Sequence, residues 1–550
     1  MQAFRCGGRL FPLLVLLLLF CVVVSGLEVE GPPALRRPNV VFVVSDDQDL
    51  MLGGLEPMPH LRNLLQAQGT NFDNFFATTP VCCPSRTTIL SGRYPHNTGQ
   101  PTDGWCGNTP SSDYKRSTVA YYLHNFGYAT GMFGKYLNNY ETFCFDKANP
   151  IPPGWDRWFT MCDDSKYFDN AFNDQGNMVS SGETLQDYMT SIIGNQSIRW
   201  MQERLEKQEP FFSYIALHAP HVPATPAPWY QRMFSNGSAP RTPNFNFHAV
   251  DHHWIVRQQQ EMDSQHTIPY TDELFRRRWQ TLVSIDDLLR DIVILLSKYN
   301  QLDNTYILYT SDHGYQLGQF RLPLSKLQAY EHDIRVPMIL RGPGITPNTH
   351  IEPIAGLVDL APTVLELVGA PVPDTMDGIS LVPLLQSAQH WSKQLEESAQ
   401  REANNYKKHR LNVYPIDLLQ QRGEGKKDKL FWRSAYLLEY WANDTVIRGP
   451  PSYTEQAKLP PEGLGHIVDI RNNTLLGLRV KNSTHDLLYA EYTDKNDPFF
   501  KAPLEFEYYN ITEDPWQMHN NYKTAPSWLI QDLRSQLHQL FLCKGKQCRL

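Results

Sequence analysis

Continuous apolar runs rich in β-branched residues recur through the first two thirds of the chain. They cover residues 39–45, 129–133, 211–217, 305–310 and 336–341. Such runs lack the polar alternation of half-exposed strands and are typical of strands buried on both faces of a parallel sheet. Segments with helical character lie between them, at residues 59–68, 197–208 and 275–298. This alternation predicts an α/β fold in which helices sandwich one large, mostly parallel sheet.

The C-terminal part of the chain follows a different pattern. Short strands are predicted at residues 466–470, 475–480, 486–492 and 504–509, and a helix at residues 527–542. They predict a small antiparallel sheet against which the last helix packs. The polar, charged stretch before them is interpreted as a surface insertion or linker, with a basic protein-binding patch as the alternative. The expected organisation is a main domain at residues 37–385, the insertion at 386–429 and a C-terminal subdomain at 430–550.

The first 26 residues have the layout of a secretory signal peptide. Arg5 and Arg9 precede an apolar run at residues 11–24, and Ser25 and Gly26 provide small residues for cleavage. An uncleaved membrane anchor is the alternative, but the run is short for a bilayer span. Six N-x-S/T sequons follow, at Asn195, Asn236, Asn443, Asn472, Asn482 and Asn510. Together these features predict a glycosylated secretory-pathway protein without a membrane span in its mature form.

Composition excludes two broad classes of protein. The chain of 550 residues has 50 Lys and Arg against 58 Asp and Glu, a net charge of −8 that excludes a generally basic nucleic-acid binder. Hydrophobic residues at 41% and aromatic residues at 12% exclude a disordered chain. Two of the nine cysteines lie in the signal peptide, so seven remain, and one of these is expected to have a role outside disulfides. Cys543 and Cys548 are close enough in sequence to pair with each other.

Acidic residues directly follow two of the predicted buried strands. Asp46 and Asp47 come after the first run, and Asp312 and His313 come just after the run at residues 305–310. Ligands of open α/β sheets bind beyond the carboxyl ends of strands, and adjacent carboxylates repel each other unless a cation lies between them. The two segments can therefore converge on one oxygen-rich site for a divalent cation. Taken singly, each is more often an ordinary turn or helix N-cap.

A pair of cysteines precedes a predicted helix start. Cys82 and Cys83 are followed by Pro84, which suits the first turn of a helix, where the positive end of the helix dipole favours anions. Arg86 lies four residues after Cys82, one helical turn away, so the two side chains can face each other. A bare cysteine pair is more often structural, so this arrangement alone does not identify a nucleophile.

The pattern Cys82-x-Pro84-x-Arg86, with Leu90-Ser91-Gly92-Arg93 after it, resembles the signature of type I sulfatases, which belong to the alkaline phosphatase superfamily. The resemblance implies that Cys82, and not Cys83, is oxidised to formylglycine. This modification takes place in the endoplasmic reticulum and requires the formylglycine-generating enzyme. It would also leave an even number of thiols.

The same resemblance covers the chain from residue 37 onwards and implies the remaining site residues. The implied ligands of one Ca²⁺ are residue 82 together with Asp46, Asp47, Asp312 and His313. The other implied catalytic residues are Arg86, Lys135, Lys326 and His221, the second histidine of an H-x-P-H-x-P motif. In this scheme a hydroxyl of the formylglycine hydrate attacks sulfur and the two lysines hold sulfate oxygens. Arg86 would orient the hydrate, and His221 would protonate the leaving alcohol.

Within the family, the likeness is greatest to the N-acetylglucosamine-6-sulfatases of lysosomal glycosaminoglycan breakdown. It is carried by segments that include residues 46–49, 134–138, 275–288 and 509–515. It implies removal of 6-sulfate from N-acetylglucosamine or glucosamine of heparan or keratan sulfate, in the lysosome or outside the cell. A secreted arylsulfatase of broader specificity is the alternative. Two positions depart from the pattern: Leu137 stands where many sulfatases carry a histidine, with Asn138 as a substitute, and His313 stands where this subfamily carries asparagine.

Two further functions compete with this interpretation. A phosphodiesterase or phosphatase of the same superfamily would use Ser or Thr as nucleophile with two zinc ions, and Cys82 in its motif argues against it. A catalytically silent protein that binds sulfated glycans needs no nucleophile, so the complete set of predicted catalytic residues argues against it. The expected partner is therefore a sulfated glycan or another sulfate ester, bound as a substrate.

Overall fold

The computed structural model describes residues 37–102, 112–138, 140, 151–162, 166–388, 432–442, 471–494 and 496–549. By their contacts, Pro38–Leu550 form one compact unit. Several predicted features lie outside the described residues: the signal peptide (1–26), nearly all of the insertion (389–429), the sequon at Asn443 and the strand at 466–470.

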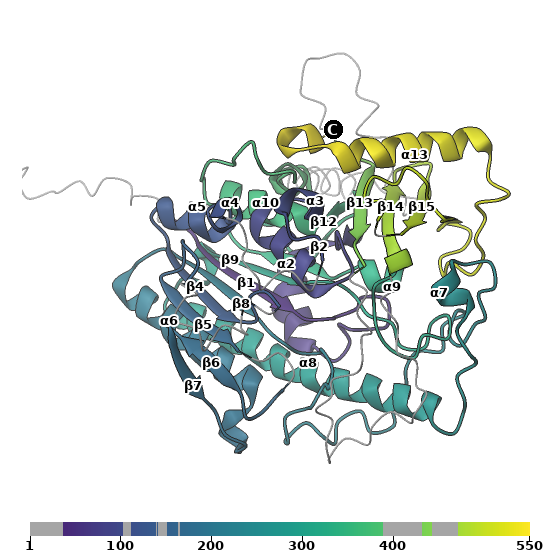
Figure 1. Ribbon diagram of the computed structural model, residues 1–550. Helices are drawn as coiled ribbons and strands as arrows, with labels where there is room; N and C mark the ends of the chain where they lie inside the picture. The colour runs from purple at the N-terminus through teal and green to yellow at the C-terminus, as the bar shows by residue number, and fades with distance from the viewer. Residues whose placement is uncertain are drawn as a thin grey trace, which may run out of the picture. The chain divides into compact units, whose positions relative to one another are not determined.

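A ten-stranded sheet forms the centre of this unit (Figure 1). In spatial order its strands are β11 (Thr349–Ile351), β2 (Thr70–Phe72), β10 (Met338–Arg341), β9 (Thr305–Ser311), β1 (Asn39–Ser45), β8 (Phe211–Ala216), β4 (Ala129–Gly134), β5 (Arg157–Met161), β6 (Ala171–Asp174) and β7 (Asn177–Ser180). The central strands β9-β1-β8-β4-β5 run parallel, whereas β10 and β6 pair antiparallel with their inner neighbours. The predicted α/β fold with a mostly parallel sheet is therefore confirmed.

Strand β1 is buried completely because helices cover both faces of the sheet (Figure 1). Successive side chains of a strand point to opposite faces. Val40, Phe42 and Val44 accordingly pack into one hydrophobic cluster, and Val41 and Val43 into another. The helices of the first cluster are α2 (Cys82–Ser91), α5 (Val119–Asn125) and α10 (Leu360–Leu367), and those of the second are α6 (Met189–Lys207) and α8 (Thr267–Lys298).

Two helices begin earlier than predicted. Helix α6 starts at Met189 and α8 at Thr267, each about two turns before the expected start. The first turns of α6 have weak helix propensity, but burial of Met189 and Ile193 outweighs it. In α8, Pro269 stands in the first turn, where its missing amide hydrogen costs no hydrogen bond. The helix predicted at residues 59–68 has a π-helical centre, η1 (Leu61–Gln66).

A second, antiparallel sheet lies near the C-terminus. In order, its strands are β13 (Ala435–Tyr440), β14 (Thr474–Lys481), β15 (Asp486–Thr493) and β16 (Glu505–Asn510), and helix α13 (Ser527–Leu542) packs against it. Three strands and the helix confirm the prediction. Strand β13 was not predicted, because a short apolar run next to a charged segment fits a strand or a helix equally well. The division of the chain into domains stays a prediction.

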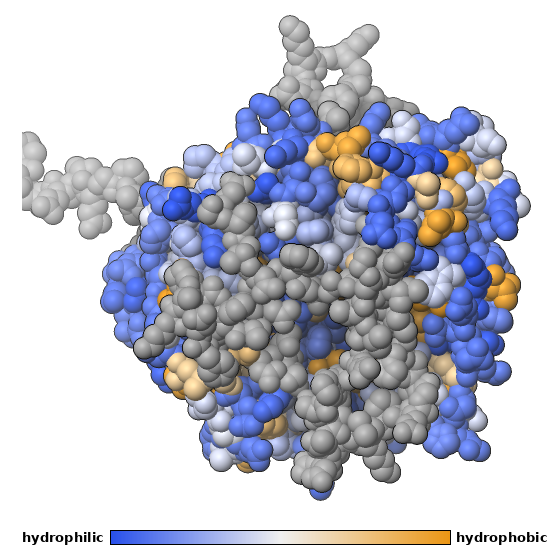
Figure 2. Space-filling view, in the orientation of Figure 1, coloured by the Kyte–Doolittle hydropathy of each residue, from blue (hydrophilic) through white to orange (hydrophobic). Residues whose placement is uncertain are grey.

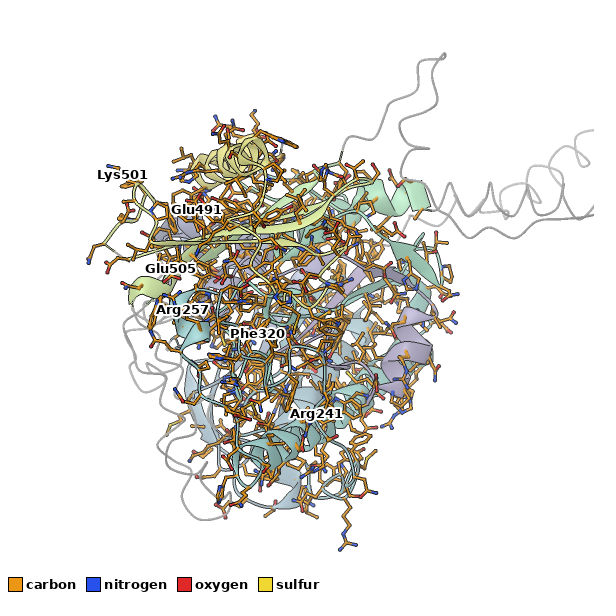
Figure 3. The ribbon with its side chains drawn as sticks, turned by 90° about the vertical axis from the view of Figure 1, so that its right-hand side faces the viewer. Arg241, Arg257, Phe320, Glu491, Lys501 and Glu505 are labelled. Atoms are coloured by element: carbon orange, nitrogen blue, oxygen red, sulfur yellow. A yellow bond between two sulfur atoms is a disulfide. The ribbon has the colours of Figure 1, made fainter. Side chains whose placement is uncertain are left out.

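Buried and exposed ion pairs join the small sheet to the rest of the unit. Arg257, at the end of α7 (Trp254–Arg257), makes a two-point ion pair with Glu505 of β16, with Nη2 3.0 Å from Oε1 (Figure 3). Nearby, Nδ1 of the buried His253 lies 3.0 Å from Oε1 of Glu507. Burial alone would raise the pKa of Glu507. The adjacent His253 imidazole opposes this effect, and the pKa is lowered to about 2. These contacts tie β16 to the segment between β8 and α8.

Where Figure 2 shows described residues, they are mostly hydrophilic, with small separate hydrophobic patches. Within the described ranges, no helix has both the length and the apolarity needed to cross a bilayer.

His96 makes a contact that is expected to couple stability to pH. It lies in α3 (Pro95–Thr98), with Nδ1 2.6 Å from Oε1 of Glu439 in β13 and Nε2 3.1 Å from the carbonyl oxygen of Cys543. Burial opposes protonation of the ring, but the Glu439 carboxylate raises the pKa of His96 to about 9. This pKa exceeds the ordinary value of 6.5, so the protonated His96 stabilises the folded state through its pair with Glu439. That stabilisation of the fold is complete below pH 6.5 and is lost as the pH rises through 9.

We therefore expect His96→Gln to lower the free energy of unfolding by about 1–3 kcal/mol at pH 6 and by much less above pH 9. Unfolding by urea at the two pH values measures the difference. His124→Gln is the matched control, since His124 and its partner Asp156 are both more than a third exposed and such pairs contribute little. An equal loss of stability at both pH values would contradict the prediction.

Candidate active site

The pairing of β1 with β9 brings the two acidic segments together. The strands are parallel, and their last residues lie in register, so both segments leave the same edge of the sheet. The amide of Asp47 donates to Oδ1 of Asp312 at 3.0 Å, and Nε2 of His313 lies 3.4 Å from Oδ1 of Asp47. Asp46, Asp47, Asp312 and His313 are all buried. Four of the five residues that were predicted as metal ligands are thus neighbours.

Helix α2 begins at Cys82 and points its first residue at this cluster. Val81 is extended and precedes the helix, as an N-cap residue does. The thiol of Cys82 donates to Oδ1 of Asp46 at 3.6 Å, and Nζ of Lys326 donates to the sulfur at 3.2 Å. Nε2 of His313 lies 3.4 Å from the same sulfur. Burial raises the pKa of the Cys82 thiol.

The cysteines differ in their bonding. Cys82 is free, whereas Cys83 and Cys162 are each in a disulfide. Cys543 and Cys548 are bonded to each other. Among the described cysteines, the one without a disulfide is therefore the one at the start of α2.

Arg86 connects helix α2 to both strand ends. Its Nε and Nη2 lie 2.9 Å from Oδ2 of Asp312, and Nη2 lies 3.5 Å from Oδ1 of Asp46. Nη1 donates to the carbonyl oxygen of Lys135 at 3.0 Å. Burial opposes the charge, but the carboxylates of Asp312 and Asp46 raise the pKa of Arg86. Ser85 adds a hydrogen bond of 2.5 Å from its hydroxyl to the carbonyl oxygen of Asp312.

Two lysines pair with the carboxylates that directly follow β1. Nζ of Lys135, directly after β4, lies 2.8 Å from Oδ2 of Asp46, and Nζ of Lys326 forms an ion pair with Oδ1 of Asp47. Gly134 precedes Lys135 with φ +96°, and a Cβ atom there would lie 2.0 Å from the carbonyl oxygen of Ala216, so glycine is required. Burial opposes the charge of Lys326, but Asp47 raises its pKa well above the ordinary value.

The charges of the site balance. The three carboxylates belong to Asp46, Asp47 and Asp312. The three permanently charged cations are Arg86, Lys135 and Lys326. A divalent cation and a sulfate monoester, which together carry one excess positive charge, therefore fit this site without a large net charge in a buried volume.

His221 lies at the rim of the cluster, on the loop that follows β8. Its Nε2 is 3.8 Å from Oδ2 of Asp47, and its side chain is 21% exposed, against 0–1% for the carboxylates. Its Nδ1 lies 2.7 Å from the carbonyl oxygen of Val222, which requires Nδ1 to be the protonated nitrogen. Nε2 is therefore the nitrogen that can exchange a proton with a bound molecule.

His218 is a member of the cluster that the sequence interpretation missed. Its Nδ1 lies 3.5 Å from Oδ2 of Asp46, and its ring centre is 4.7 Å from that of His221. Burial lowers the pKa of His218 to about 4, so the ring is neutral at physiological pH. The H-x-P-H spacing was the available signal, because it places both histidines on one tight loop.

Leu137, at the position where many sulfatases carry a histidine, is fully buried in a hydrophobic cluster. It offers no proton acceptor. Asn138, the predicted substitute, is partly exposed.

The donor atoms fit a divalent cation. Single atoms of Asp46, Asp47, Cys82 and His313 lie within 4.8 Å of one another. Oδ2 of Asp47 is buried and makes no hydrogen bond within the described part of the chain, as a carboxylate oxygen reserved for a cation would. Burial raises the pKa of Asp46, but Lys135 and Arg86 lower it well below the ordinary value, so this carboxylate is ionised. Asp312 lies beside the group, with Oδ1 3.7 Å from Nε2 of His313.

Comparison with known proteins places this geometry in a family. The sequence profile described as Sulfatase matches residues 38–370, more than half of the chain. The chain is 35% identical to human N-acetylglucosamine-6-sulfatase over 547 residues, which cover 98% of this chain and 90% of the human protein. It is 40% identical to the extracellular sulfatase SULF-1 homolog of Drosophila melanogaster over 359 residues, which cover 64% of this chain and 32% of that protein.

Solved structures share the fold at lower identity. One is the structure of BT4656 in complex with its substrate D-glucosamine-2-N,6-O-disulfate, with a TM-score of 0.63, 21% identity and coverage of 91% of this chain and 97% of that chain. Another is a phosphonate monoester hydrolase from Silicibacter pomeroyi, with a TM-score of 0.63, 19% identity and coverage of 92% and 94%. On the profile match and the near full-length likeness to the human enzyme, the chain belongs to the sulfatase family and is a sulfuric ester hydrolase.

Proposed function

We propose that this sulfatase removes the 6-sulfate group from terminal N-acetylglucosamine or glucosamine of heparan or keratan sulfate, using Ca²⁺ and a formylglycine made from Cys82. The observation that carries the proposal is the position of the Cys82 sulfur, within 3.6 Å of Asp46, His313 and Lys326. The choice of sugar is supported by the 35% identity to N-acetylglucosamine-6-sulfatase over almost the whole chain.

Asp46, Asp47, Asp312 and His313 would hold the cation together with residue 82. When bound, calcium supplies positive charge for sulfate oxygens, and formylglycine supplies the nucleophilic hydroxyl. The raised pKa of the buried Cys82 thiol supports modification, because an unmodified thiol there would remain largely protonated and a poor nucleophile.

The cationic side chains of the site would bind the substrate anion. Lys135 and Lys326 are placed to hold the non-bridging sulfate oxygens, since both Nζ atoms already face carboxylates of the same cluster. Arg86 would orient residue 82 and Asp312. It contacts Asp312 through two nitrogens of its planar guanidinium, a fork that lysine cannot reproduce. These groups would stabilise the negative charge on the sulfate oxygens without accepting a proton.

His221 would protonate the leaving sugar hydroxyl, because its Nε2 lies at the exposed rim of the site and its Nδ1 is held by Val222. His221→Asn is expected to lower kcat on N-acetylglucosamine-6-sulfate by about 10²–10⁴. Hydrolysis of nitrocatechol sulfate should change much less, because its leaving group needs no proton. Steady-state kinetics with both esters measure the two effects, and the exposed His248→Asn is the matched control. Equal losses on both esters would contradict the assignment.

The substrate is tested by sulfate release from defined compounds. The purified full chain should desulfate N-acetylglucosamine-6-sulfate and a terminal 6-sulfated heparan oligosaccharide more efficiently than nitrocatechol sulfate. Activity on the aryl ester alone would favour the broader arylsulfatase. Hydrolysis of phosphodiesters in preference to sulfate esters would favour the chemistry of the phosphonate hydrolases that share the fold. Binding of sulfated glycan without turnover would favour a silent binding protein.

The cellular route follows from the chemistry. Formylglycine formation requires passage through the endoplasmic reticulum and contact with the formylglycine-generating enzyme. The signal-peptide pattern and the sequons support this route, and the lysosome is the proposed destination, with secretion as the alternative. The five described sequons are at least partly exposed, which is compatible with glycosylation, at Asn195, Asn236, Asn472, Asn482 and Asn510.

A further inference from the structure

Arg278, in the middle of α8, contacts three of the loops that surround the site. Its Nη2 donates to the carbonyl oxygen of Asp47 at 2.6 Å and to Oδ1 of Asp49 at 3.0 Å. Its Nη1 donates to the carbonyl oxygen of Pro220 at 3.3 Å. Its guanidinium carbon lies 4.2 Å from the centre of the Tyr315 ring. Because the three loops follow β1, β8 and β9, one side chain bridges all of them.

Each bridged loop carries a residue of the candidate active site. The first carries Asp47 itself, the second carries His221 next to Pro220, and the third carries His313 two residues before Tyr315. Asp47 has φ 67°, a left-handed conformation that is uncommon for a residue other than glycine. The hydrogen bond from Arg278 to its carbonyl oxygen holds the peptide group that follows this unusual conformation.

The environment of Arg278 explains why arginine is suited to this position. The side chain is 2% exposed, so each of its acceptors is removed from competing water. Its planar fork reaches two backbone carbonyls and one carboxylate at fixed angles and stacks on an aromatic ring. A lysine would keep the charge but could not meet these partners together.

We propose that Arg278 is a positioning residue that sets the placement of Asp47 relative to His221. The inference rests on the proposed function, in which Asp47 binds calcium and His221 protonates the leaving oxygen. Nε2 of His221 lies 3.8 Å from Oδ2 of Asp47, so a shift of either loop changes this separation directly. Outer contacts to metal ligands typically change metal affinity or activity by about 10–100-fold when they are removed.

A simpler role would be neutralisation of Asp49, whose Oδ1 accepts from Arg278 and whose Oδ2 accepts from the amide of Leu52. The two roles make different predictions. If neutralisation were the whole role, then removing the charge of Asp49 and removing the fork of Arg278 would have the same effect on the site. If positioning dominates, the site should depend on the fork and much less on the ion pair.

Arg278→Lys keeps the charge and removes the fork. Calcium titration calorimetry on the purified full chain should show affinity lowered by about 10–100-fold. The ratio of turnover on nitrocatechol sulfate to turnover on N-acetylglucosamine-6-sulfate should rise, since a displaced His221 impairs only the step that needs a proton. The adjacent Arg277→Lys is the matched control: Arg277 pairs with Glu273 on the outer face of the same helix, and both readouts should stay at the wild-type level.

Asp49→Asn is the second variant, and it retains the bonds from Arg278 to Asp47 and Pro220. It should lower the melting temperature, because a buried cation loses its partner, while calcium affinity stays near the wild-type value. Wild-type calcium affinity and an unchanged substrate ratio in Arg278→Lys would overturn the inference, as would an equal loss of calcium affinity in Asp49→Asn. A wild-type chain that binds no calcium would instead overturn the proposed function on which the inference rests.

Discussion

Cys82→Ala is expected to lower sulfate release from N-acetylglucosamine-6-sulfate by about four to six orders of magnitude. The proposed mechanism takes its nucleophile from position 82, and alanine cannot be converted to formylglycine. Asp46, His313 and Lys326 remain in place around the missing sulfur, so substrate binding should survive. Ion chromatography of released sulfate at saturating substrate measures kcat, and calorimetry with the sulfated sugar measures binding.

Mass spectrometry of the wild-type peptide makes the same test independently of activity. Residue 82 should have lost sulfur and gained oxygen, while Cys83 remains in its disulfide. Active protein with an unmodified thiol at position 82 would refute the nucleophile assignment. The melting temperature of Cys82→Ala serves as the control for folding, because a small side chain at the first residue of α2 leaves the helix intact.

Asp47→Asn is expected to lower turnover by about a thousandfold and to abolish calcium binding at millimolar concentrations. Asp47 supplies one of the donor atoms that lie within 4.8 Å of one another, and its buried Oδ2 accepts no hydrogen bond from any described group. Burial raises the pKa of Asp47, but Lys326 and His221 lower it below its ordinary value, so the carboxylate is charged throughout the working pH range. Asparagine tolerates the left-handed conformation at φ 67°, so the backbone should be preserved.

The matched control for this variant is Asp169→Asn. Asp169 also has a positive φ, of 51°, and pairs with Lys166 on an exposed loop. It should leave kcat, KM and calcium binding unchanged. Treatment of the wild-type chain with a calcium chelator should reproduce the loss seen in Asp47→Asn, and added Ca²⁺ should restore activity to the wild type alone. Full activity of Asp47→Asn without a change in calcium affinity would rule out its role as a ligand.

The candidate site could be predicted where local pattern and sheet topology coincide. The run before Asp46 is apolar on both faces of β1, and the run before Asp312 is apolar on both faces of β9. Both strands must therefore lie inside the sheet, and parallel neighbours end at the same edge. The residues after them had to be close, whatever the details of the loops. Cys82 was placed by its motif, because a helix start is recognisable within a few residues.

Other features depended on partners far away along the chain. The early start of α6 and the strand β13 follow from burial against distant segments, which outweighs weak local propensity. The role inferred for Arg278 depends on a contact with Asp47 across 231 positions of sequence, and that of His218 on a contact with Asp46. Nothing in the residues next to either side chain indicates which acceptor it will meet.

By itself, then, the sequence determined the α/β class, the acidic strand ends and the cysteine at the start of a helix. Each of these features depends on the spacing of hydrophobic residues or on a short motif. Both are signals that can be read within a few neighbouring residues of the sequence. Only the tertiary structure decided which cation faces which carboxylate, which histidine is buried and neutral, and which arginine bridges the three loops. Those outcomes depend on side-chain distances and desolvation, which exist only after segments separated by hundreds of residues have packed together.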